Sequence, residues 1–351
     1  MGNANKKEST MKAAVHNPYL DTLGGGERYT LTVAKALVEF GYKVDLEWKD
    51  KAVIKKIERR FGMDLSSINV VDTIKRGDGY DVCFWLSDGS IPTLKSRNNL
   101  LHFQEPFVNV DGTSLLNRMK LFRINHIVCN SAFTKGFIDK EYSVDSKVVY
   151  PPVDINSFKA KGKQNIILFV GRFSQLKQSK NQHILLKAFK NFYDYGYRNY
   201  RLVLAGGVEV GVGDYLDKLK KEAQGYPVIF EESPDFIRLK GLYGKAKIFW
   251  SAVGYGEDEH KRPQKVEHFG ITLVEAMASG CAVFALNAGG YKEIVDHGED
   301  GILWRTQEEL VSETIKVIES KSSLSVFSKR ALKKSKSFSE ENFINKIKEL
   351  L

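Results

Sequence analysis

Short apolar runs alternate with amphipathic segments along the whole chain, and this alternation constrains the fold more than any other feature. Met11–Asn17 and Asp81–Leu86 are runs of the β type, whereas Glu27–Phe40 and Asn181–Tyr193 place apolar residues at helical spacing. Chains that alternate in this way form parallel sheets with helices on both faces. The pattern therefore predicts an α/β protein of the Rossmann type.

The expected strands fall into two series separated by a proline-containing segment. The sequence Tyr150-Pro151-Pro152-Val153-Asp154, followed by a polar run, is typical of a linker. Because the chain has 351 residues and domains contain ~150 residues, we expect two domains. The first series comprises Met11–Asn17, Lys43–Trp48, Ile68–Val71, Asp81–Leu86, Leu100–Phe103 and His126–Cys129; the second comprises Asn165–Val170, Arg201–Ala205, Val228–Phe230, Lys247–Ser251, Ala282–Leu286 and Gly301–Trp304.

Domain boundaries follow from these series. Residues 1–153 are expected to form an N-terminal Rossmann-like domain and residues 154–336 a C-terminal one. The segment 337–351 is expected to be an amphipathic helix with Ser339 as its N-cap, because Glu340 and Glu341 follow in the first turn.

The chain is basic, and its positive charge is concentrated. It carries 53 Lys and Arg against 43 Asp and Glu, a formal net charge of +10. Such a balance favours an anionic partner, which can be a nucleic acid, an acidic membrane or a phosphorylated ligand. The largest excess lies in residues 151–200, and no RNP or zinc-finger spacing accompanies it. We therefore expect no nucleic-acid partner and a phosphate site near residues 171–180.

Cysteine usage and hydropathy indicate the compartment. Cys83, Cys129 and Cys281 each lie in an apolar run, which fits buried thiols in a reducing environment. Residues 1–10 have no apolar signal segment, and no apolar stretch is long enough to cross a membrane. A cytoplasmic protein is expected. Lys51–Arg60 can form a basic helix on anionic lipid, at the cytoplasmic face of a membrane, or an ordinary solvated helix face.

Two motifs suit an anionic ligand. Gly24-Gly25-Gly26-Glu27-Arg28 lies between a strand and a helix, where glycines permit close approach and helix N–H groups attract anions. The spacing matches neither a dinucleotide fingerprint nor a P-loop, so a tight structural turn is the alternative. Gly171-Arg172-Phe173 with Lys177 and Lys180 precedes a helix and suits a diphosphate, or is a solvated basic loop.

A further motif carries two glutamates. Glu267 is expected in a loop, and Glu275 in a helix that ends at Gly280. The apolar residues around Glu275 predict a buried helix, so its carboxylate needs a partner. Carboxylates suit sugars because they accept two hydrogen bonds from a vicinal diol. Gly289-Gly290 forms another strand-to-helix turn that suits a phosphate.

These residues resemble the retaining glycosyltransferases of family 4, which have the GT-B fold. Their hallmark is E-x7-E, written Glu-x-Phe-Gly, four residues and Glu-Ala-Met-Ala-x-Gly, and the segment from Glu267 to Gly280 reads this way. The Glu267–Ile271 segment is similar to that of lipid-linked-oligosaccharide mannosyltransferases and of bacterial relatives. The resemblance implies two Rossmann-like domains that face each other across a cleft. It places the acceptor in the domain 1–153, completed by helix 337–351, and the donor in the domain 154–336.

The resemblance also implies roles for individual residues. His102, Arg172, Lys180 and Glu267 would be catalytic: Glu267 faces the sugar hydroxyls, His102 lies near the transferred sugar, and Arg172 with a lysine neutralises the diphosphate. The spacing from Arg172 selects Lys177 as that lysine, and the spacing to Ala188 selects Lys180. Glu275 would bind the ribose. The remaining donor-side residues are Gly25, Gly26, Phe269, Gly270, Ile271, Thr272, Gly289 and Gly290, and the acceptor-side residues are Glu27 and Arg28.

One feature departs from the family pattern. The segment Gly254–Val266 lengthens the loop before Glu267 and contains the acidic triplet Glu257-Asp258-Glu259. The triplet can suggest a metal site, but the family needs no metal and the chain contains no Asp-x-Asp. We therefore favour a mobile loop and expect neither a metal nor a resident cofactor.

The predicted function is transfer of a hexose of the mannose or glucose type, with retention, from a UDP- or GDP-linked sugar. The acceptor is expected to be a glycan, a lipid-linked glycan or another hydroxyl compound, and peripheral contact with an anionic membrane stays open. A sugar-nucleotide epimerase of the same fold and a non-catalytic nucleotide-sugar-binding protein are the alternatives. A phosphorylase is disfavoured because it needs a pyridoxal lysine and a longer chain.

Overall fold

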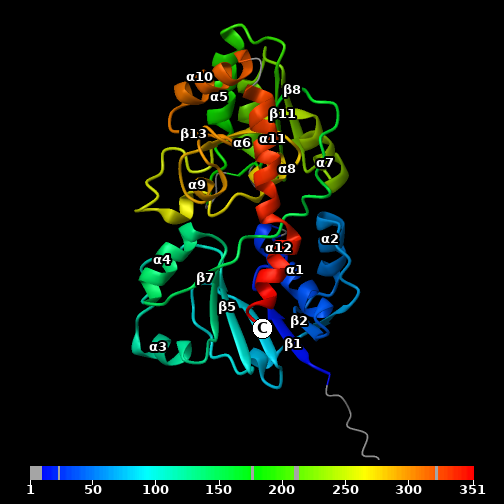
Figure 1. The fold of residues 1–351 in the computed structure, drawn as a ribbon, viewed down its shortest axis with the longest axis vertical. Helices are drawn as coiled ribbons and strands as arrows, with labels where there is room; N and C mark the ends of the chain where they lie inside the picture. The colour runs from blue at the N-terminus through cyan, green and yellow to red at the C-terminus, as the bar shows by residue number, and fades with distance from the viewer. Residues whose placement is uncertain (1–9, 23, 175–177, 209–212, 321–322) are drawn as a thin grey trace, which may run out of the picture. The chain divides into compact units, whose positions relative to one another are not determined.

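The chain divides into two compact units. A computed structural model describes residues 10–22, 24–174, 178–208, 213–320 and 323–351 (Figure 1). Unit 1 contains the described residues up to Asn130, Lys135–Val149 and Ile344–Leu351. Unit 2 contains Ser131–Thr134 and Tyr150–Phe343. The chain thus passes between units at Val149–Tyr150, where the proline-containing linker was expected.

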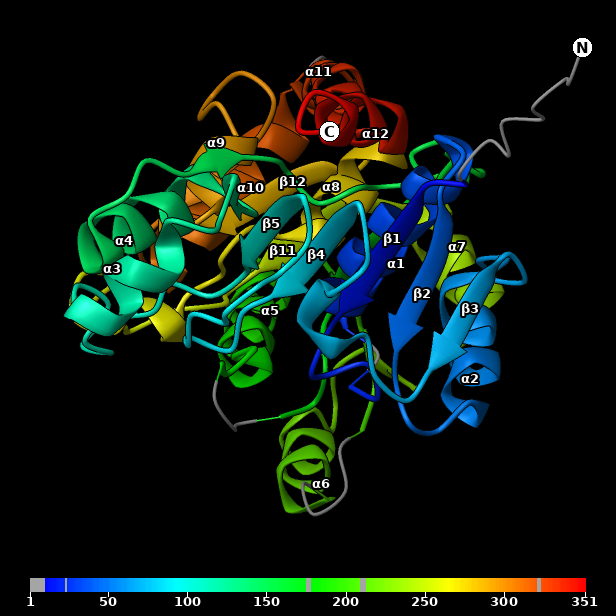
Figure 2. The same ribbon diagram turned by 90° about the horizontal axis from the view of Figure 1, so that it is seen from below.

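Unit 1 is built on a parallel sheet. Among its described residues, seven strands pair in the order β3-β2-β1-β4-β5-β6-β7, and Figure 2 shows helix α1 lying across this sheet. Every pairing is parallel. The strands are β1 (Lys12–His16), β2 (Lys43–Glu47), β3 (Ile68–Val71), β4 (Val82–Leu86), β5 (Asn98–Phe103), β6 (His126–Cys129) and β7 (Lys147–Val148). The helices of this half are α1 (Gly25–Glu39), α2 (Ala52–Phe61), η1 (Lys75–Gly77), α3 (Leu115–Leu121) and α4 (Ala132–Tyr142).

Unit 2 repeats the design. Its described strands form a six-stranded parallel sheet in the order β10-β9-β8-β11-β12-β13. They are β8 (Gln164–Val170), β9 (Arg201–Gly206), β10 (Val228–Glu232), β11 (Ala246–Ser251), β12 (Ala282–Leu286) and β13 (Ile302–Trp304). The helices are α5 (Gln182–Asp194), α6 (Gly213–Glu222), α7 (Phe236–Lys245), η2 (Pro263–Lys265), α8 (Ile271–Ala278), α9 (Tyr291–Ile294), α10 (Gln307–Glu319), α11 (Ser323–Ser335), η3 (Lys336–Phe338) and α12 (Glu340–Lys348).

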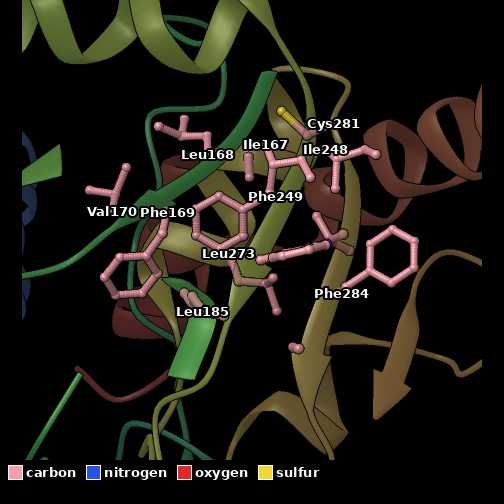
Figure 3. Packing of buried hydrophobic residues seen from close by; sticks show 14 of the residues in the cluster. Ile167, Leu168, Phe169, Val170, Leu185, Ile248, Phe249, Leu273, Cys281 and Phe284 are labelled. Atoms are coloured by element: carbon pink, nitrogen blue, oxygen red, sulfur yellow. The ribbon is translucent and has the colours of Figure 1, made fainter. Parts of the chain in front are cut away.

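The core of unit 2 explains why its strands are continuous apolar runs. Ile167, Leu168 and Phe169 on β8 are buried, as are Phe249 on β11 and Phe284 on β12 (Figure 3). Helices cover both faces of such a sheet, so successive residues of a strand all lie in apolar surroundings. The same pattern made these strands predictable from sequence.

The C-terminal helix α12 continues from unit 2 into unit 1. Its N-cap is Ser339, whose Oγ accepts a hydrogen bond from the N–H of Asn342 at 3.2 Å, as predicted. Farther along, the side-chain amide of Asn98 donates to the carbonyl oxygen of Leu350 at 2.9 Å. The regular helix begins at Glu340 rather than at 337, because residues Lys336–Phe338 form a separate 3₁₀ turn.

The predicted fold class of two parallel-sheet α/β domains is confirmed. Expected and observed strand ends differ by at most two residues, and β5 begins at Asn98 instead of Leu100. The short strand β7 was not predicted. Helix α1 begins at Gly25, so Gly25 and Gly26 lie in its first turn rather than in the preceding loop. No helix in the described ranges combines the length and the apolarity that a membrane span requires.

Candidate active site

An ion pair between Lys180 and Glu267 lies in unit 2, next to the start of α8. The Nζ of Lys180 is 3.1 Å from Oε2 of Glu267, and the two side chains are only 15% and 18% exposed. Lys180 also donates to Oε1 of Gln178 at 2.6 Å, and Gln178 donates to the carbonyl oxygen of Val266. The structure therefore brings together two residues that lie 87 positions apart in the chain.

Two glycines hold the backbone on the other side of Glu267. The N–H of Gly290 donates to the carbonyl oxygen of Glu267 at 2.8 Å. A Cβ atom at Gly289 would lie 2.2 Å from that oxygen, and one at Gly290 would lie 2.3 Å from the carbonyl oxygen of His268. Only glycine permits so close an approach, so the Gly289-Gly290 turn fixes the position of Glu267.

Helix α8 begins beside this turn. Its N-cap Gly270 has φ of +118°, and a Cβ atom there would lie 2.6 Å from the ring of Tyr291. The N–H groups of Ile271 and Thr272 come before the first α-helical bonds, so they have no acceptor within the helix. Glu275 follows on α8 and is buried, and the helix ends before Gly280, whose φ of +68° terminates it. The predicted placement of both glutamates is confirmed.

The side chain of Phe269 belongs to the core. It is 2% exposed and packs against Tyr150 and Phe338, with ring centroids 5.5 Å away in each case. Tyr150 begins the main segment of unit 2, and Phe338 lies near its end. Only the backbone of Phe269 can therefore face a ligand in this arrangement, in keeping with the backbone contact that the family resemblance implies.

The turn that carries Arg172 packs closely against the end of β9. A Cβ atom at Gly206 would lie 1.9 Å from the carbonyl oxygen of Gly171. The N–H of Gly171 donates to Ala205, and the side-chain amide of Gln182 donates to the carbonyl oxygen of Arg172 at 2.8 Å. Arg172 itself is exposed. Lys177, the other candidate for the diphosphate, lies outside the described residues.

The acidic triplet in the loop 254–266 is dispersed among different partners. Glu259 accepts from the N–H of Gly289 at 2.7 Å and from Nζ of Lys292 at 2.6 Å. Burial alone would raise the pKa of the Glu259 carboxyl, but these two donors outweigh it and lower the pKa. Glu257 pairs with Arg262 at 2.9 Å. In the described ranges, no three His, Cys, Asp or Glu side chains are grouped as a metal site would need.

In unit 1, the side chain of Glu27 caps the N-terminus of α1, the helix that contains it. Its carboxylate accepts from the N–H of Gly24 at 2.5 Å and from Oγ1 of Thr22 at 2.9 Å, which closes a cap on α1. Gly26 faces the side chain of Gln104, which a Cβ atom would meet at 1.8 Å. The acceptor-side roles of Glu27 and Arg28 and the donor-side roles of Gly25 and Gly26 stay predictions.

His102 is enclosed by aromatic rings. It lies on β5 with no exposed surface, and its ring stacks on that of Tyr29 with centroids 4.0 Å apart. Its Nδ1 donates to the carbonyl oxygen of Val128 at 3.1 Å, and its buried Nε2 has no hydrogen-bond partner among the described residues. Burial lowers the pKa of His102 to about 3, although the bond to Val128 opposes this shift. The ring is therefore neutral, and its role near a sugar stays a prediction.

Sequence reasoning missed the residues that support the site. Gln178 and Gln182 lie close to the predicted basic motif, but their partners could not be read from spacing. Glu259 was singled out only as part of an acidic triplet. Gln178 and Glu259 bond to backbone groups 88 and 30 positions away, and Gln182 to one 10 positions away across a turn, and such bonds leave no local signal.

A family model decides the relationship of the chain. The model "Glycosyl transferases group 1" matches residues 152–334, which include the whole site in unit 2. The chain belongs to this family. The resemblance to family 4 glycosyltransferases is thereby confirmed.

Curated relatives of this glycosyl transferase group 1 member are mannosyltransferases. It is 29% identical over 226 residues to the alpha-1,3/1,6-mannosyltransferase ALG2 of Rhizomucor pusillus, covering 54% of this chain and 49% of that protein. It is 29% identical over 239 residues to the O-antigen chain mannosyltransferase RfbU of Salmonella typhimurium, covering 64% and 61% respectively. The chain thus matches about half of the length of the first relative.

Solved structures share the fold. Anabaena HepE in complex with UDP superposes with a TM-score of 0.77 at 19% identity, covering 97% of this chain and 99% of that one. A glycosyltransferase from Rickettsia africae superposes with a TM-score of 0.75 at 17% identity, with the same coverage. The family member therefore has the GT-B fold.

The close contact at Gly206 gives a stability prediction. Gly206→Ala is expected to lower the free energy of unfolding by about 2 kcal/mol or more, because the added methyl group overlaps the carbonyl oxygen of Gly171. The neighbouring Gly207→Ala is the control, since its Cβ would have its nearest contact at 3.9 Å. Urea unfolding of both variants measures the difference. Equal stability of the two variants would contradict the close approach.

The buried His102 gives a pH prediction. Its pKa of about 3 in the folded protein lies below the value of about 6.5 expected in the unfolded chain. Protonation therefore favours unfolding. The free energy of unfolding begins to fall as pH drops below 6.5, and this decrease ends below about pH 3. His102→Phe should remove about 2 kcal/mol of the stability loss between pH 7 and pH 5. Urea unfolding at both pH values measures it, and an unchanged pH dependence would contradict the enclosed, neutral ring.

Proposed function

We propose that this protein transfers a hexose from a nucleotide diphosphate sugar to a hydroxyl acceptor, with retention of the anomeric configuration and without a metal ion. The observation that carries the proposal is the partly buried Lys180–Glu267 ion pair beside the start of α8. One cation, one carboxylate and a helix N-terminus are then adjacent. This combination suits a ligand that carries both phosphate and sugar hydroxyls.

Charge on the leaving diphosphate determines the role of the basic groups. Arg172 and Lys180 would balance the charge that develops as the sugar departs, and the N–H groups of Ile271 and Thr272 would bind phosphate oxygens. Both N–H groups point along the helix axis at its positive end. The positive charge that a metal ion could supply would thus come from the protein.

The two glutamates would bind the two sugars of the donor. Glu267 is held in place by Lys180 and by the Gly289-Gly290 turn, so its carboxylate is suited to orient hexose hydroxyls. Glu275 is buried on α8 and would accept from the ribose hydroxyls. Neither carboxylate is assigned as a nucleophile. The leaving phosphate would instead help to remove the proton of the acceptor, which attacks from the same face.

The related proteins support the class of substrates. Solved structures of Anabaena HepE contain UDP, UDP-glucose or UDP with glucose. A relative from Dictyostelium discoideum is a GDP-Man:Man(3)GlcNAc(2)-PP-Dol alpha-1,2-mannosyltransferase. By analogy, we propose a UDP- or GDP-linked hexose as donor and a glycan or lipid-linked glycan as acceptor. The decisive experiment is a donor panel in which release of UDP or GDP is followed and the product linkage is determined by NMR.

Substitutions of the two glutamates test the site. Glu267→Ala is expected to lower kcat about 100-fold, because sugar orientation is lost and Lys180 is left without its carboxylate. Glu275→Ala should raise KM for the donor and lower kcat less. Glu299→Ala, which removes an exposed carboxylate elsewhere in unit 2, is the control. Steady-state kinetics with the donor found by the panel measures each effect, and wild-type rates in both site variants would contradict the assignment.

Chelation tests the proposed source of positive charge. Because Arg172, Lys180 and the start of α8 are expected to stabilise the diphosphate, the initial rate should not change when EDTA is added. Restoration of a lost rate by Mg²⁺ or Mn²⁺ would contradict the metal-free mechanism. An altered nucleotide sugar formed without any acceptor would instead identify an epimerase.

A further inference from the structure

Helix α3 exposes an unusual amount of apolar surface. Six large apolar side chains in the described part of the chain are more than half exposed, and four of them belong to α3 and its C-cap. Leu115 is 76%, Leu116 63%, Met119 63% and Phe122 92% exposed. Scattered single residues of this kind are ordinary on a protein surface, but a continuous apolar patch marks an interaction site.

The four residues lie on one side of the helix. At about 100° per residue, Leu115, Leu116, Met119 and Phe122 fall within an arc of about 120°. Arg118 borders this arc on one side and Lys120 on the other. Leu121 points to the opposite side and packs, with Ile124, against the buried cluster that contains Leu101 and Phe103. The apolar arc is therefore the outward face of a helix whose inward face is already packed.

The segment that carries α3 is firmly attached to unit 1. The carboxylate of Glu141 accepts hydrogen bonds from the N–H groups of Asn109 and Val110, both at 2.9 Å. Beyond the helix, Nε of Arg123 donates to the carbonyl oxygen of Leu94 at 2.7 Å. These bonds fix both ends of the segment that connects β5 to β6. The apolar side chains are thus held at the surface by the fold.

Charge selects the partner. Residues 112–126 contain three cations, Arg118, Lys120 and Arg123, and no Asp or Glu. A second copy of the chain would bring the same cations together across a two-fold axis, which is unfavourable. A partner with an apolar interior and a negatively charged surface would match both the apolar side chains of α3 and the cations beside them. An anionic lipid bilayer has this structure.

We propose that α3 is a membrane-docking element, with Leu115, Leu116, Met119 and Phe122 inserted among lipid chains and Arg118 and Lys120 contacting anionic headgroups. The basic helix α2 is the other candidate, but Val53 and Ile57 are buried and none of its large apolar side chains is exposed. Figures 1 and 2 show α2 and α3 at opposite ends of the sheet of unit 1, so substitutions can separate them. The proposal does not depend on the transfer reaction, since binding is measured without donor or acceptor.

Flotation with vesicles tests the proposal. The wild-type protein is expected to float with phosphatidylcholine vesicles that contain phosphatidylglycerol and to bind pure phosphatidylcholine more weakly. Leu115→Ser/Phe122→Ser should lower the partition coefficient roughly tenfold or more. Arg118→Gln/Lys120→Gln should lower binding to the anionic vesicles by a similar factor and leave the weak binding to neutral vesicles unchanged.

Matched variants provide the controls. Tyr195→Ser/Ile237→Ser removes equally exposed apolar groups from unit 2 and should leave binding unchanged. Lys55→Gln/Lys56→Gln does the same for exposed charges of α2. Thermal unfolding confirms that each variant folds. Three results would overturn the proposal: no binding of the wild type to anionic vesicles, wild-type binding by the α3 variants, or a dimer that Leu115→Ser/Phe122→Ser converts to a monomer without any effect on vesicle binding.

Discussion

The candidate active site depends on one close backbone approach in unit 2. The Gly289-Gly290 turn lies so near the backbone of Glu267 and His268 that a side chain at either glycine would overlap a carbonyl oxygen. The hydrogen bond from Gly290 then fixes the carbonyl of Glu267, and Lys180 fixes its carboxylate. A carboxylate whose backbone is fixed and whose oxygen is paired can orient a ligand without first having to be ordered, which is the condition for preorganised catalysis.

Charge balance follows from this arrangement. Lys180 and Glu267 are both largely shielded from water, so removal of one leaves the other in an unfavourable state. Glu259 is balanced in turn by the N–H of Gly289 and by the more exposed Lys292. Both glutamates therefore contact the same glycine turn, Glu267 through its backbone carbonyl oxygen and Glu259 through its carboxylate. Binding of a diphosphate would compete with carboxylates for cations that already have partners.

The sequence predicted the parts that local pattern determines. Buried parallel strands are continuous apolar runs, and α8 was evident from its apolar residues and from Gly280. The contacts of Gln178 with Val266 and of Glu259 with Gly289 could not be predicted, because they join segments that only the folded chain brings together. His102 shows the same limit: its position on a strand was expected, but its enclosure by Tyr29 results from the packing of α1 on the sheet.

Helix α3 shows why an apolar pattern alone cannot separate a core helix from a surface-binding one. Leu115, Leu116 and Met119 have the spacing of a buried face, yet the side that packs is the one with Leu121. The net charge of +10 is equally ambiguous, since lysines on α2 and α3 contribute alike. What distinguishes α3 is that cations flank exposed apolar groups. Electrostatic attraction brings a protein to an anionic surface, and burial of apolar groups among the lipid chains then strengthens the binding. Only the combination of the two makes a docking element.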